Sequence, residues 1–238
     1  MKITAIILAR GGSKGLPNKN ILNFCGKPLI CWTIENCFKA GIDSVWVSSD
    51  SEKILKISEN HGANILKRPD RISDDNSSSE EAWLHAINYI ESFQNIKTDF
   101  IFAPQVTSPL REVNDITNAI KIIKKENLDS LFSASIVEDL FFWEKNNKGF
   151  LESVNYDWNN RKRRQDISEK FIENGSFYFF KPNILRSNNN RFGGKIGFSE
   201  NQKWQSFEID DLDDWKFVSL IFKKYLLQKY KKLKKNYG

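Results

Sequence analysis

The amino-acid sequence predicts an α/β protein with a mostly parallel central sheet and helices on both faces of that sheet. Short apolar runs typical of strands alternate with longer helical patterns over the first 136 residues. This alternation is the arrangement that builds parallel sheets through βαβ crossovers. The length of 238 residues suits one domain with a sizeable core. We therefore expect residues 1–238 to form a single domain.

Five short segments are the expected strands of the sheet. The first is apolar at all but one position and leads into a glycine-rich loop, whereas the other four are shorter and carry β-branched or aromatic residues, which favour strands. The expected strands are Ile3–Leu8, Ser44–Ser48, Asn64–Leu66, Asp99–Phe102 and Ser130–Ala134.

Helical patterns fill most of the intervals between these strands. Pro28 suits the first turn of a helix, where its missing N–H does no harm. Either Asp50 or Ser51 can cap the helix that leads to Asn60. The expected helices are Pro28–Ala40, Ser51–Asn60, Ser79–Ser92 and Val113–Glu126.

The pattern changes after residue 136. Leu140–Glu144 and Phe150–Asn155 are expected to be short strands joined by a turn. A basic, polar stretch follows at residues 159–166, and Ser176–Phe180 is again a strongly strand-forming run. We therefore expect residues 140–172 to leave the main sheet as an inserted arm or lid.

A final helix is expected from about Leu212 to Leu233, with an apolar stripe at i, i+3, i+4 and i+7 that begins at Val218. Residues 216–238 carry eight lysines and no acids, so residues 1–215 have a net charge of −2 although the whole chain has +6. The slightly acidic body argues against a nucleic-acid partner. A lysine run of this kind is typical of a solvated helix face.

Composition excludes several other classes of site. Cys25, Cys31 and Cys37 match neither a disulfide framework nor a zinc site, and we expect them to be packing residues in a reducing compartment. With His61 and His85 as the only histidines, histidine-rich metal sites are not expected. No apolar stretch is long enough to span a bilayer, and the start of the chain lacks a secretion-signal pattern. We expect a cytoplasmic protein without stable membrane association.

The most informative motif is ARGGSKGLPNKN at residues 9–20, directly after the first strand. Its glycines allow backbone N–H groups to approach an anion closely. Arg10, Lys14 and Lys19 add cations and Ser13 adds a hydroxyl donor, a combination that suits a polyphosphate. The motif is neither the P-loop nor the dinucleotide fingerprint. The alternative is an ordinary βα turn with surface lysines.

Two further loops follow expected strands, and ligands of open α/β sheets bind at the carboxyl ends of the strands. In the loop 68–79, serines can cap the next helix, but capping does not explain Arg68 and Asp75. In the loop 104–111, two prolines stiffen a surface of donors and acceptors that suits a sugar acid. Those polar residues are Gln105, Thr107, Ser108 and Arg111. The alternative for this loop is a rigid βα turn.

Two later segments complete the candidate site. Asn174 precedes Gly175, and an Asn-Gly pair is first of all a turn signal. Because the pair also stands directly before an expected strand, Asn174 is a candidate substrate contact. Glu208 and Asp210 are two residues apart, so an extended backbone points both carboxylates to one side. A divalent cation relieves their repulsion and bridges to phosphate oxygens. The aspartates that follow are explained by the positive end of the helix dipole.

Over nearly its full length the chain resembles the acylneuraminate and 3-deoxy-octulosonate cytidylyltransferases, also called CMP–sialic acid synthetases. The resemblance depends on ARGGSKGLPNKN at 9–20, RP at 68, QxTSPLR at 105–111, NG at 174 and EID at 208. It implies a Rossmann-like nucleotidyltransferase fold and a dimer formed through the inserted arm. It also implies that CTP and a 2-keto-3-deoxy sugar acid react to give the CMP-sugar and pyrophosphate, with Mg²⁺.

The resemblance further implies roles for individual residues. The candidate catalytic residues are Arg10, Lys14 and Lys19. The candidate nucleotide contacts are Ala9, Arg10, Gly11, Ser13, Lys14, Asn20, Arg68, Asp75 and Ser79. The candidate sugar contacts are Gln105, Thr107, Ser108, Arg164 and Asn174. The expected magnesium ligands are Glu208 and Asp210, and no general base is assigned.

Two departures leave the identity of the sugar acid open. Val106 stands where the family usually has proline, and Glu208 stands where many relatives have aspartate. Sialic, legionaminic, pseudaminic and octulosonic acids all remain candidates. One alternative function is a nucleotidyltransferase for a sugar 1-phosphate, which shares the fold and the glycine loop. Another is a non-catalytic binding protein that acts through the lysine-rich C-terminal segment.

Overall fold

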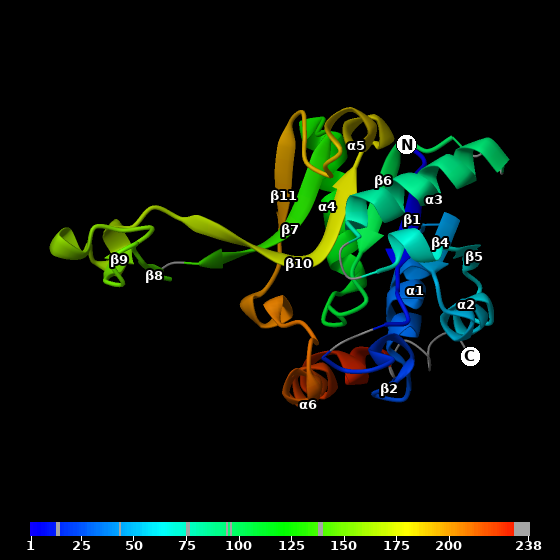
Figure 1. The fold of residues 1–238 in the computed structure, drawn as a ribbon, viewed down its shortest axis with the longest axis horizontal. Coiled ribbons are helices and arrows are strands. Elements are labelled where there is room, and N and C mark those ends of the chain that lie inside the picture. The colour runs from blue at the N-terminus through cyan, green and yellow to red at the C-terminus, as the bar shows by residue number, and fades with distance from the viewer. Residues whose placement is uncertain are drawn as a thin grey trace.

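The computed structural model has a seven-stranded sheet, in which all neighbours are parallel except β10, which is antiparallel to both β6 and β7 (Figure 1). The strand order is β11 (Ile196–Glu200), β7 (Ser130–Val137), β10 (Lys170–Phe180), β6 (Phe100–Pro104), β1 (Ile3–Leu8), β4 (Ser44–Ser49) and β5 (Asn64–Lys67). The structure describes residues 1–12, 15–42, 44–74, 77–93, 95, 97–137 and 140–230. The predicted fold class, a mostly parallel α/β sheet, is confirmed.

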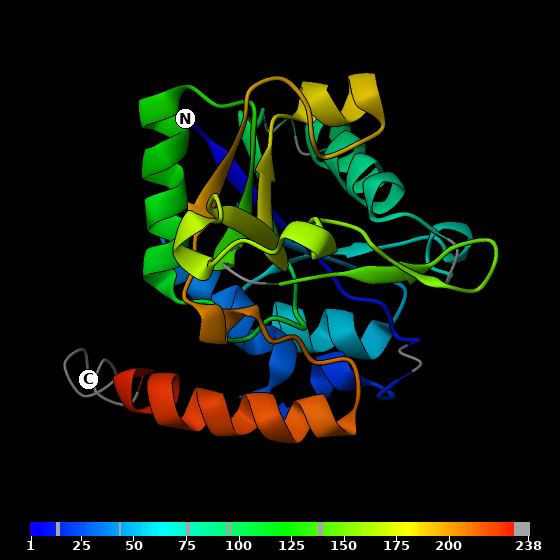
Figure 2. The same cartoon turned by 90° about the vertical axis from the view of Figure 1, so that its left-hand side faces the viewer.

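Helices cover both faces of the sheet, as Figure 2 shows from the side. The helices are α1 (Leu29–Lys39), α2 (Glu52–Glu59), α3 (Ser79–Phe93), α4 (Val113–Glu126), α5 (Pro182–Asn188) and α6 (Leu212–Phe222). Alternate residues of β1 point to opposite faces. Ala5 and Ile7 therefore join one apolar cluster with residues of α1, α2, α4 and α6, whereas Ile6 joins a second cluster with residues of α3 and α5.

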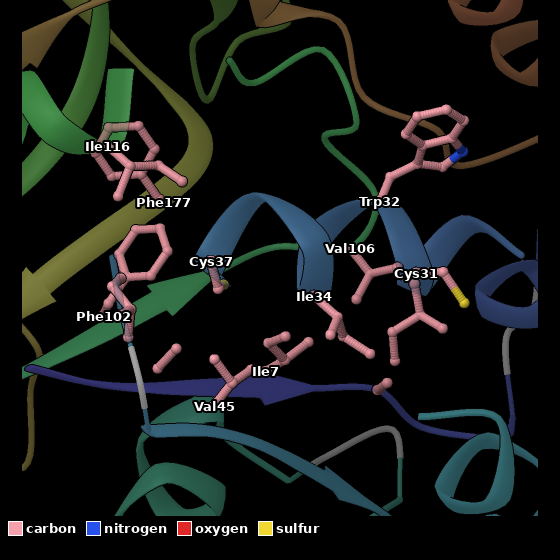
Figure 3. Close-up of a cluster of buried hydrophobic side chains, with 14 of the residues drawn as sticks. Ile7, Cys31, Trp32, Ile34, Cys37, Val45, Phe102, Val106, Ile116 and Phe177 are labelled. Atoms are coloured by element: carbon pink, nitrogen blue, oxygen red, sulfur yellow. The ribbon is translucent and has the colours of Figure 1, made fainter. Parts of the chain in front are cut away.

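The larger cluster fixes α1 on the sheet (Figure 3). Ile34 and Cys37 of α1 are fully buried, as are Val45 of β4 and Phe102 of β6. Cys31 is also fully buried, and burial raises the pKa of Cys37 to about 12. These two cysteines are packing residues, as expected.

Short elements complete the fold and place the glycine loop. A 3-10 turn, η1, and a small hairpin lead from the loop into α1, and a second 3-10 turn, η2, follows β5. Their bounds are η1 (Lys19–Ile21), β2 (Asn23–Phe24), β3 (Lys27–Pro28), η2 (Asp70–Ile72) and η5 (Lys203–Ser206). Beyond α6 the helix continues through the π-helical segment η6 (Lys223–Leu227) to residue 230. The predicted end at Leu233 lies outside the described residues.

Residues 140–172, here termed the arm, extend away from the sheet (Figure 1). The arm contains a small hairpin and two 3-10 turns: β8 (Trp143–Lys145), β9 (Leu151–Ser153), η3 (Trp158–Asn160) and η4 (Arg164–Asp166). Several of its large apolar side chains are exposed: Leu140, Phe142, Trp143, Phe150, Leu151, Val154, Trp158, Phe171 and Ile172. Strands β7 and β10 run longer than predicted because they pair with each other out toward the arm.

Three local predictions differ from the structure. Neither β11 nor α5 is predicted, because their segments carry glycine, asparagine and proline among few apolar residues. Either Asp50 or Ser51 was expected to cap α2, but the N-cap Ser51 makes no side-chain cap hydrogen bond. The Asp50 carboxylate instead accepts from the Gly11 N–H. Within the described part of the chain, no helix has the length and apolarity to cross a membrane. The cytoplasmic location stays a prediction.

Candidate active site

A cleft of about 560 Å³ opens at the carboxyl ends of the parallel strands. The chain proceeds from β1 outward to β4 and β5, and then returns to β6 on the other side of β1. This reversal is the topological switch point where open α/β sheets bind ligands. The lining residues are Leu8, Arg10, Gly15, Lys19, Asn20, Arg68, Ile72, Ser73, Asp74, Ser77, Ser78, Ser79, Trp83, Pro104, Gln105, Val106, Thr107, Glu208 and Asp210.

The glycine loop after β1 forms one wall of this cleft. Asn20 is buried, and its amide donates to the Arg10 carbonyl at 3.0 Å. The Arg10 guanidinium reaches the Asp74 carbonyl at 3.4 Å, on the opposite loop. Arg10 and Asn20 both line the cleft, and Asn20 also fixes the backbone at Arg10. Ala9 is buried behind the wall, at 1% exposure.

The second half of the loop lies against the acidic segment that precedes α6. The Lys19 ammonium donates to the Ile209 carbonyl at 2.8 Å and to Asp210 Oδ1 at 3.0 Å. A Cβ atom on Gly15 would stand 2.3 Å from the Asp210 carbonyl oxygen, so this position requires glycine because the two backbones are in contact. Two predicted phosphate contacts, Ser13 and Lys14, lie outside the described residues.

The loop after β5 forms the facing wall. Arg68 is buried, and its Nε donates to Ser73 Oγ at 3.0 Å. Ser79 lines the cleft, and the serine that caps α3 is Ser78, whose Oγ accepts from the Glu81 N–H at 3.1 Å. Asp75, a predicted nucleotide contact, lies outside the described residues.

The loop after β6 divides its polar residues between the cleft and the core. Gln105 and Thr107 line the cleft. Ser108 is fully buried beneath the cleft, and its hydroxyl donates to Glu208 Oε1 at 3.1 Å. The expectation that Arg111 presents donors to a ligand is wrong, because this side chain is 1% exposed and donates to Ser176 and Thr33.

The two expected magnesium ligands, Glu208 and Asp210, both line the cleft next to the glycine loop. Burial raises the pKa of Glu208, the hydrogen bond from Ser108 opposes this shift, and the nearby negative charge of Asp210 adds to it. The carboxylate also packs on Gly175, which has φ +65°. Any side chain at Gly175 would collide with Glu208, because a Cβ there would stand 2.0 Å from Oε1.

Besides Ser108, two further predicted sugar contacts are not among the residues that line the cleft. Asn174 is buried, and its Oδ1 accepts from Ser133 Oγ at 2.6 Å and from the Ser176 N–H at 3.2 Å. This network stabilises the irregular pairing of β10 with β7. Arg164 lies in the 3-10 turn η4 of the arm, and its side chain is outside what the structure describes.

Sequence reasoning missed Trp83, which lines the cleft from α3 and is 3% exposed. The Arg191 guanidinium stacks over its ring at 4.7 Å and donates to Glu80 Oε1 at 2.8 Å. The sequence spacing could have indicated this residue. Trp83 is four residues after Ser79, a predicted nucleotide contact, and therefore lies on the same face of the helix. An apolar residue in a helical pattern is taken for core unless the helix is known to border a cleft.

The structure is a Rossmann-like α/β fold with a cleft that brings cations and carboxylates together at one edge of the sheet. Three cations, Arg10, Lys19 and Arg68, line one cleft together with the carboxylates of Glu208 and Asp210, and Lys19 is paired with Asp210. This donor set suits a nucleotide with a divalent cation.

Comparison with known proteins specifies the family. The family model described as cytidylyltransferase matches residues 4–237, and the chain belongs to this family. It is 39% identical over 219 residues to N-acylneuraminate cytidylyltransferase A of Danio rerio, covering 90% of this chain and 49% of that protein. It is 31% identical over 230 residues to the pseudaminic acid cytidylyltransferase of Campylobacter jejuni subsp. jejuni serotype O:23/36 (strain 81-176), covering 94% and 97% of the two chains.

A solved structure has the same fold. CMP:2-keto-3-deoxy-manno-octonic acid synthetase complexed with CTP superposes with a TM-score of 0.70 at 15% identity, covering 95% of this chain and 100% of that chain. At this identity the likeness concerns the fold alone. The chain spans about half the length of the fish relatives that it matches, with shares of 49%, 48% and 49%.

Proposed function

We propose that the chain is a cytidylyltransferase that activates a nine-carbon 2-keto-3-deoxy sugar acid with CTP. The anomeric hydroxyl oxygen of the sugar forms a bond to the α-phosphorus of CTP, and the bond from that phosphorus to the bridging oxygen of the β-phosphate breaks. The products are the CMP-sugar and pyrophosphate, and the hydroxyl proton is released. No residue is assigned as its acceptor.

The observation that carries the proposal is the convergence of three predicted motifs on one cleft. The glycine loop, the loop after β6 and the acidic segment before α6 are far apart in sequence, yet Arg10, Gln105 and Glu208 line the same cavity. The similarity to N-acylneuraminate and pseudaminic acid cytidylyltransferases supports a nine-carbon acid as the acceptor.

The residues of the cleft act mainly by position and charge. Arg10 and Lys19 stand where a triphosphate along the glycine loop would place its oxygens, so they would neutralise charge that develops on the leaving pyrophosphate. Arg68 and Ser79, which line the cleft, would contact the nucleotide, and Gln105 would contact the sugar acid. Trp83 and neighbouring apolar residues reduce the access of water to the reacting groups.

The residues present fit a magnesium ion. Among the described residues, no group of three Asp, Glu, His or Cys side chains could enclose a metal. Magnesium is usually held by one or two carboxylates together with substrate phosphates and water. Glu208 and Asp210 are a pair of this kind, and a bound Mg²⁺ would neutralise phosphate charge and help to orient the triphosphate.

Pyrophosphate release tests the proposal directly. The purified protein is incubated with CTP, Mg²⁺ and, in turn, N-acetylneuraminic, legionaminic, pseudaminic and 3-deoxy-octulosonic acids. We expect release with at least one nine-carbon acid and a preference for CTP over ATP, GTP and UTP. Absence of release across the panel would sink the proposal. Release with a sugar 1-phosphate instead would favour the alternative nucleotidyltransferase.

A matched pair of variants tests the acidic segment. Asp210→Asn should lower kcat by about a hundredfold, because it removes a carboxylate that holds the metal and phosphates in place. Asp213→Asn should leave kcat unchanged, because Asp213 is 91% exposed and pairs with Lys216 outside the cleft. Equal activities of the two variants would show that the metal site is misplaced.

We also propose that two copies associate through the arm. Large exposed apolar patches mark interaction surfaces, and Phe150, Leu151 and Trp158 of the arm are 69%, 62% and 57% exposed. The resemblance to dimeric cytidylyltransferases supports the same conclusion. A homodimer would cover these side chains, which a monomer leaves in water.

A further inference from the structure

Asp50 directly follows β4 and lies between two loops of the cleft wall. Its Oδ1 accepts from the Gly11 N–H at 2.9 Å and stands 3.9 Å from Nη2 of Arg68. Asp50 stands one residue before Ser51, the N-cap residue of α2, which makes no side-chain cap hydrogen bond. The position of Asp50 is therefore explained by the cleft rather than by the helix.

On one side, Asp50 fixes the glycine loop. A Cβ atom on Gly11 would stand 3.1 Å from Ser51 Cβ and 3.5 Å from Asp50 Oδ2, so the loop lies against this turn. A hydrogen bond to a carboxylate is stronger than one between neutral groups. The bond holds the backbone immediately after Arg10, whose side chain lines the cleft.

On the other side, Asp50 balances a buried cation. The side chain of Arg68 is 6% exposed. Burial lowers the pKa of Arg68, the Asp50 carboxylate opposes that shift, and the charge of Arg10 adds to it. A buried guanidinium without a nearby anion pays a large desolvation cost. The charge of Asp50 thus reduces the cost of holding Arg68 at the cleft.

We propose that Asp50 is a positioning residue for the nucleotide half of the site. It orients the segment Arg10–Gly11 through the amide of Gly11 and supports Arg68 through its charge. It acts through these residues and is itself absent from the cleft lining. The inference rests on the proposed function, because the ligand that these residues would meet is CTP.

Two substitutions separate the hydrogen bond from the charge. Asp50→Asn keeps an oxygen that can accept from Gly11, whereas Asp50→Ala removes the acceptor altogether. The matched control is Glu52→Ala, because Glu52 is a nearby carboxylate that pairs with the exposed Lys67. KM for CTP, KM for the sugar acid, kcat and the melting temperature are measured for all three variants and the wild type.

We expect Asp50→Ala to raise KM for CTP by about tenfold or more, as loss of a charge-assisted hydrogen bond predicts. Asp50→Asn should raise KM for CTP by a smaller factor, about threefold, because it keeps an acceptor for the Gly11 N–H but removes the charge that lies 3.9 Å from Arg68. KM for the sugar acid should change little in either. An unchanged KM for CTP in Asp50→Ala, or equal losses in both variants, would overturn the proposal.

A measurement without substrate distinguishes failure of this inference from failure of the proposed function. Amide hydrogen exchange at Gly11 is followed in the ligand-free wild type, Asp50→Asn and Asp50→Ala. We expect faster exchange in Asp50→Ala and near wild-type exchange in Asp50→Asn. If the wild type does not use CTP, the proposed function fails, and equal exchange in all three proteins overturns the role of Asp50 independently.

Discussion

Replacement of Arg111 by alanine should destabilise the fold rather than weaken substrate binding. Arg111 Nη1 donates to the Ser176 carbonyl at 2.5 Å and to its hydroxyl at 3.2 Å, and Nη2 donates to Thr33 Oγ1 at 3.3 Å. The side chain thereby links the loop after β6 to β10 and to α1. Both terminal nitrogens of Arg111 also lie 3.5 Å from the carbonyl oxygen of Gln105, at the start of the same loop.

The magnitude follows from these contacts. A hydrogen bond from a charged group contributes about 1.5–3 kcal/mol, and a buried acceptor left without a donor costs about 1–3 kcal/mol. Removing the guanidinium also removes its own desolvation cost, which offsets part of the loss. We expect Arg111→Ala to lower the free energy of unfolding by about 3–5 kcal/mol. At roughly 2–4 °C per kcal/mol for a domain of this size, the melting temperature should fall by roughly 6–20 °C.

The assay is urea denaturation of the wild type and three variants, combined with their kinetics. Arg111→Lys keeps the charge, but one ammonium cannot reach both Ser176 and Thr33, so we expect about half of the loss seen with alanine. Arg71→Ala is the control, because that side chain is 75% exposed and should change stability by less than about 0.5 kcal/mol. If Arg111→Ala stayed within about 1 kcal/mol of the wild type and raised KM for the sugar acid, Arg111 would be a ligand contact and our reasoning would be refuted.

Three further predictions concern the loop, the arm and the core. Gly15→Ala should lower kcat/KM by about a hundredfold, because its Cβ would collide with the backbone at Asp210. Gly12→Ala is the control and should have little effect, because nothing lies within 4 Å of its Cβ. Equal kinetics of the two variants would contradict this prediction. Phe150→Glu should shift the protein toward monomer in light scattering, and an unchanged mass would remove the arm from the interface. Cys37 should resist a thiol reagent at pH 8 in the folded protein, because burial raises its pKa to about 12; rapid modification would show that the core opens readily.

Much of the site could be predicted because the sheet topology does most of the positioning. Once an alternating pattern predicts a parallel sheet, polar loops after successive strands must meet at one edge. Arg10, Arg68 and Gln105 follow β1, β5 and β6, and all three line the cleft. This inference needs the order of elements and no knowledge of side-chain packing.

The orientation of individual side chains could not be predicted in the same way. Arg111 and Asn174 are polar residues in loop motifs, yet both are buried and satisfy backbone groups around β10. Strand β10 is antiparallel and bulged, with Gly175 in the left-handed region. Irregular pairing of this kind leaves carbonyl and amide groups that need buried partners. No periodic pattern in the sequence indicates which polar side chains will form hydrogen bonds with these backbone groups.

The charges of the cleft are arranged in pairs before any ligand arrives. Lys19 contacts Asp210 at 3.0 Å, and Arg68 lies 3.9 Å from Asp50. A polyphosphate that binds Lys19 must therefore compete with Asp210, so the net affinity at this cation is a difference between two interactions. Such competition rejects ligands with little charge, because they cannot replace the carboxylate. If the chain has the proposed function, the same competition would favour release of the CMP-sugar, since a single phosphodiester competes less well for the same cation than a triphosphate. The pair of Lys19 and Asp210 would thus support turnover as well as the unliganded fold.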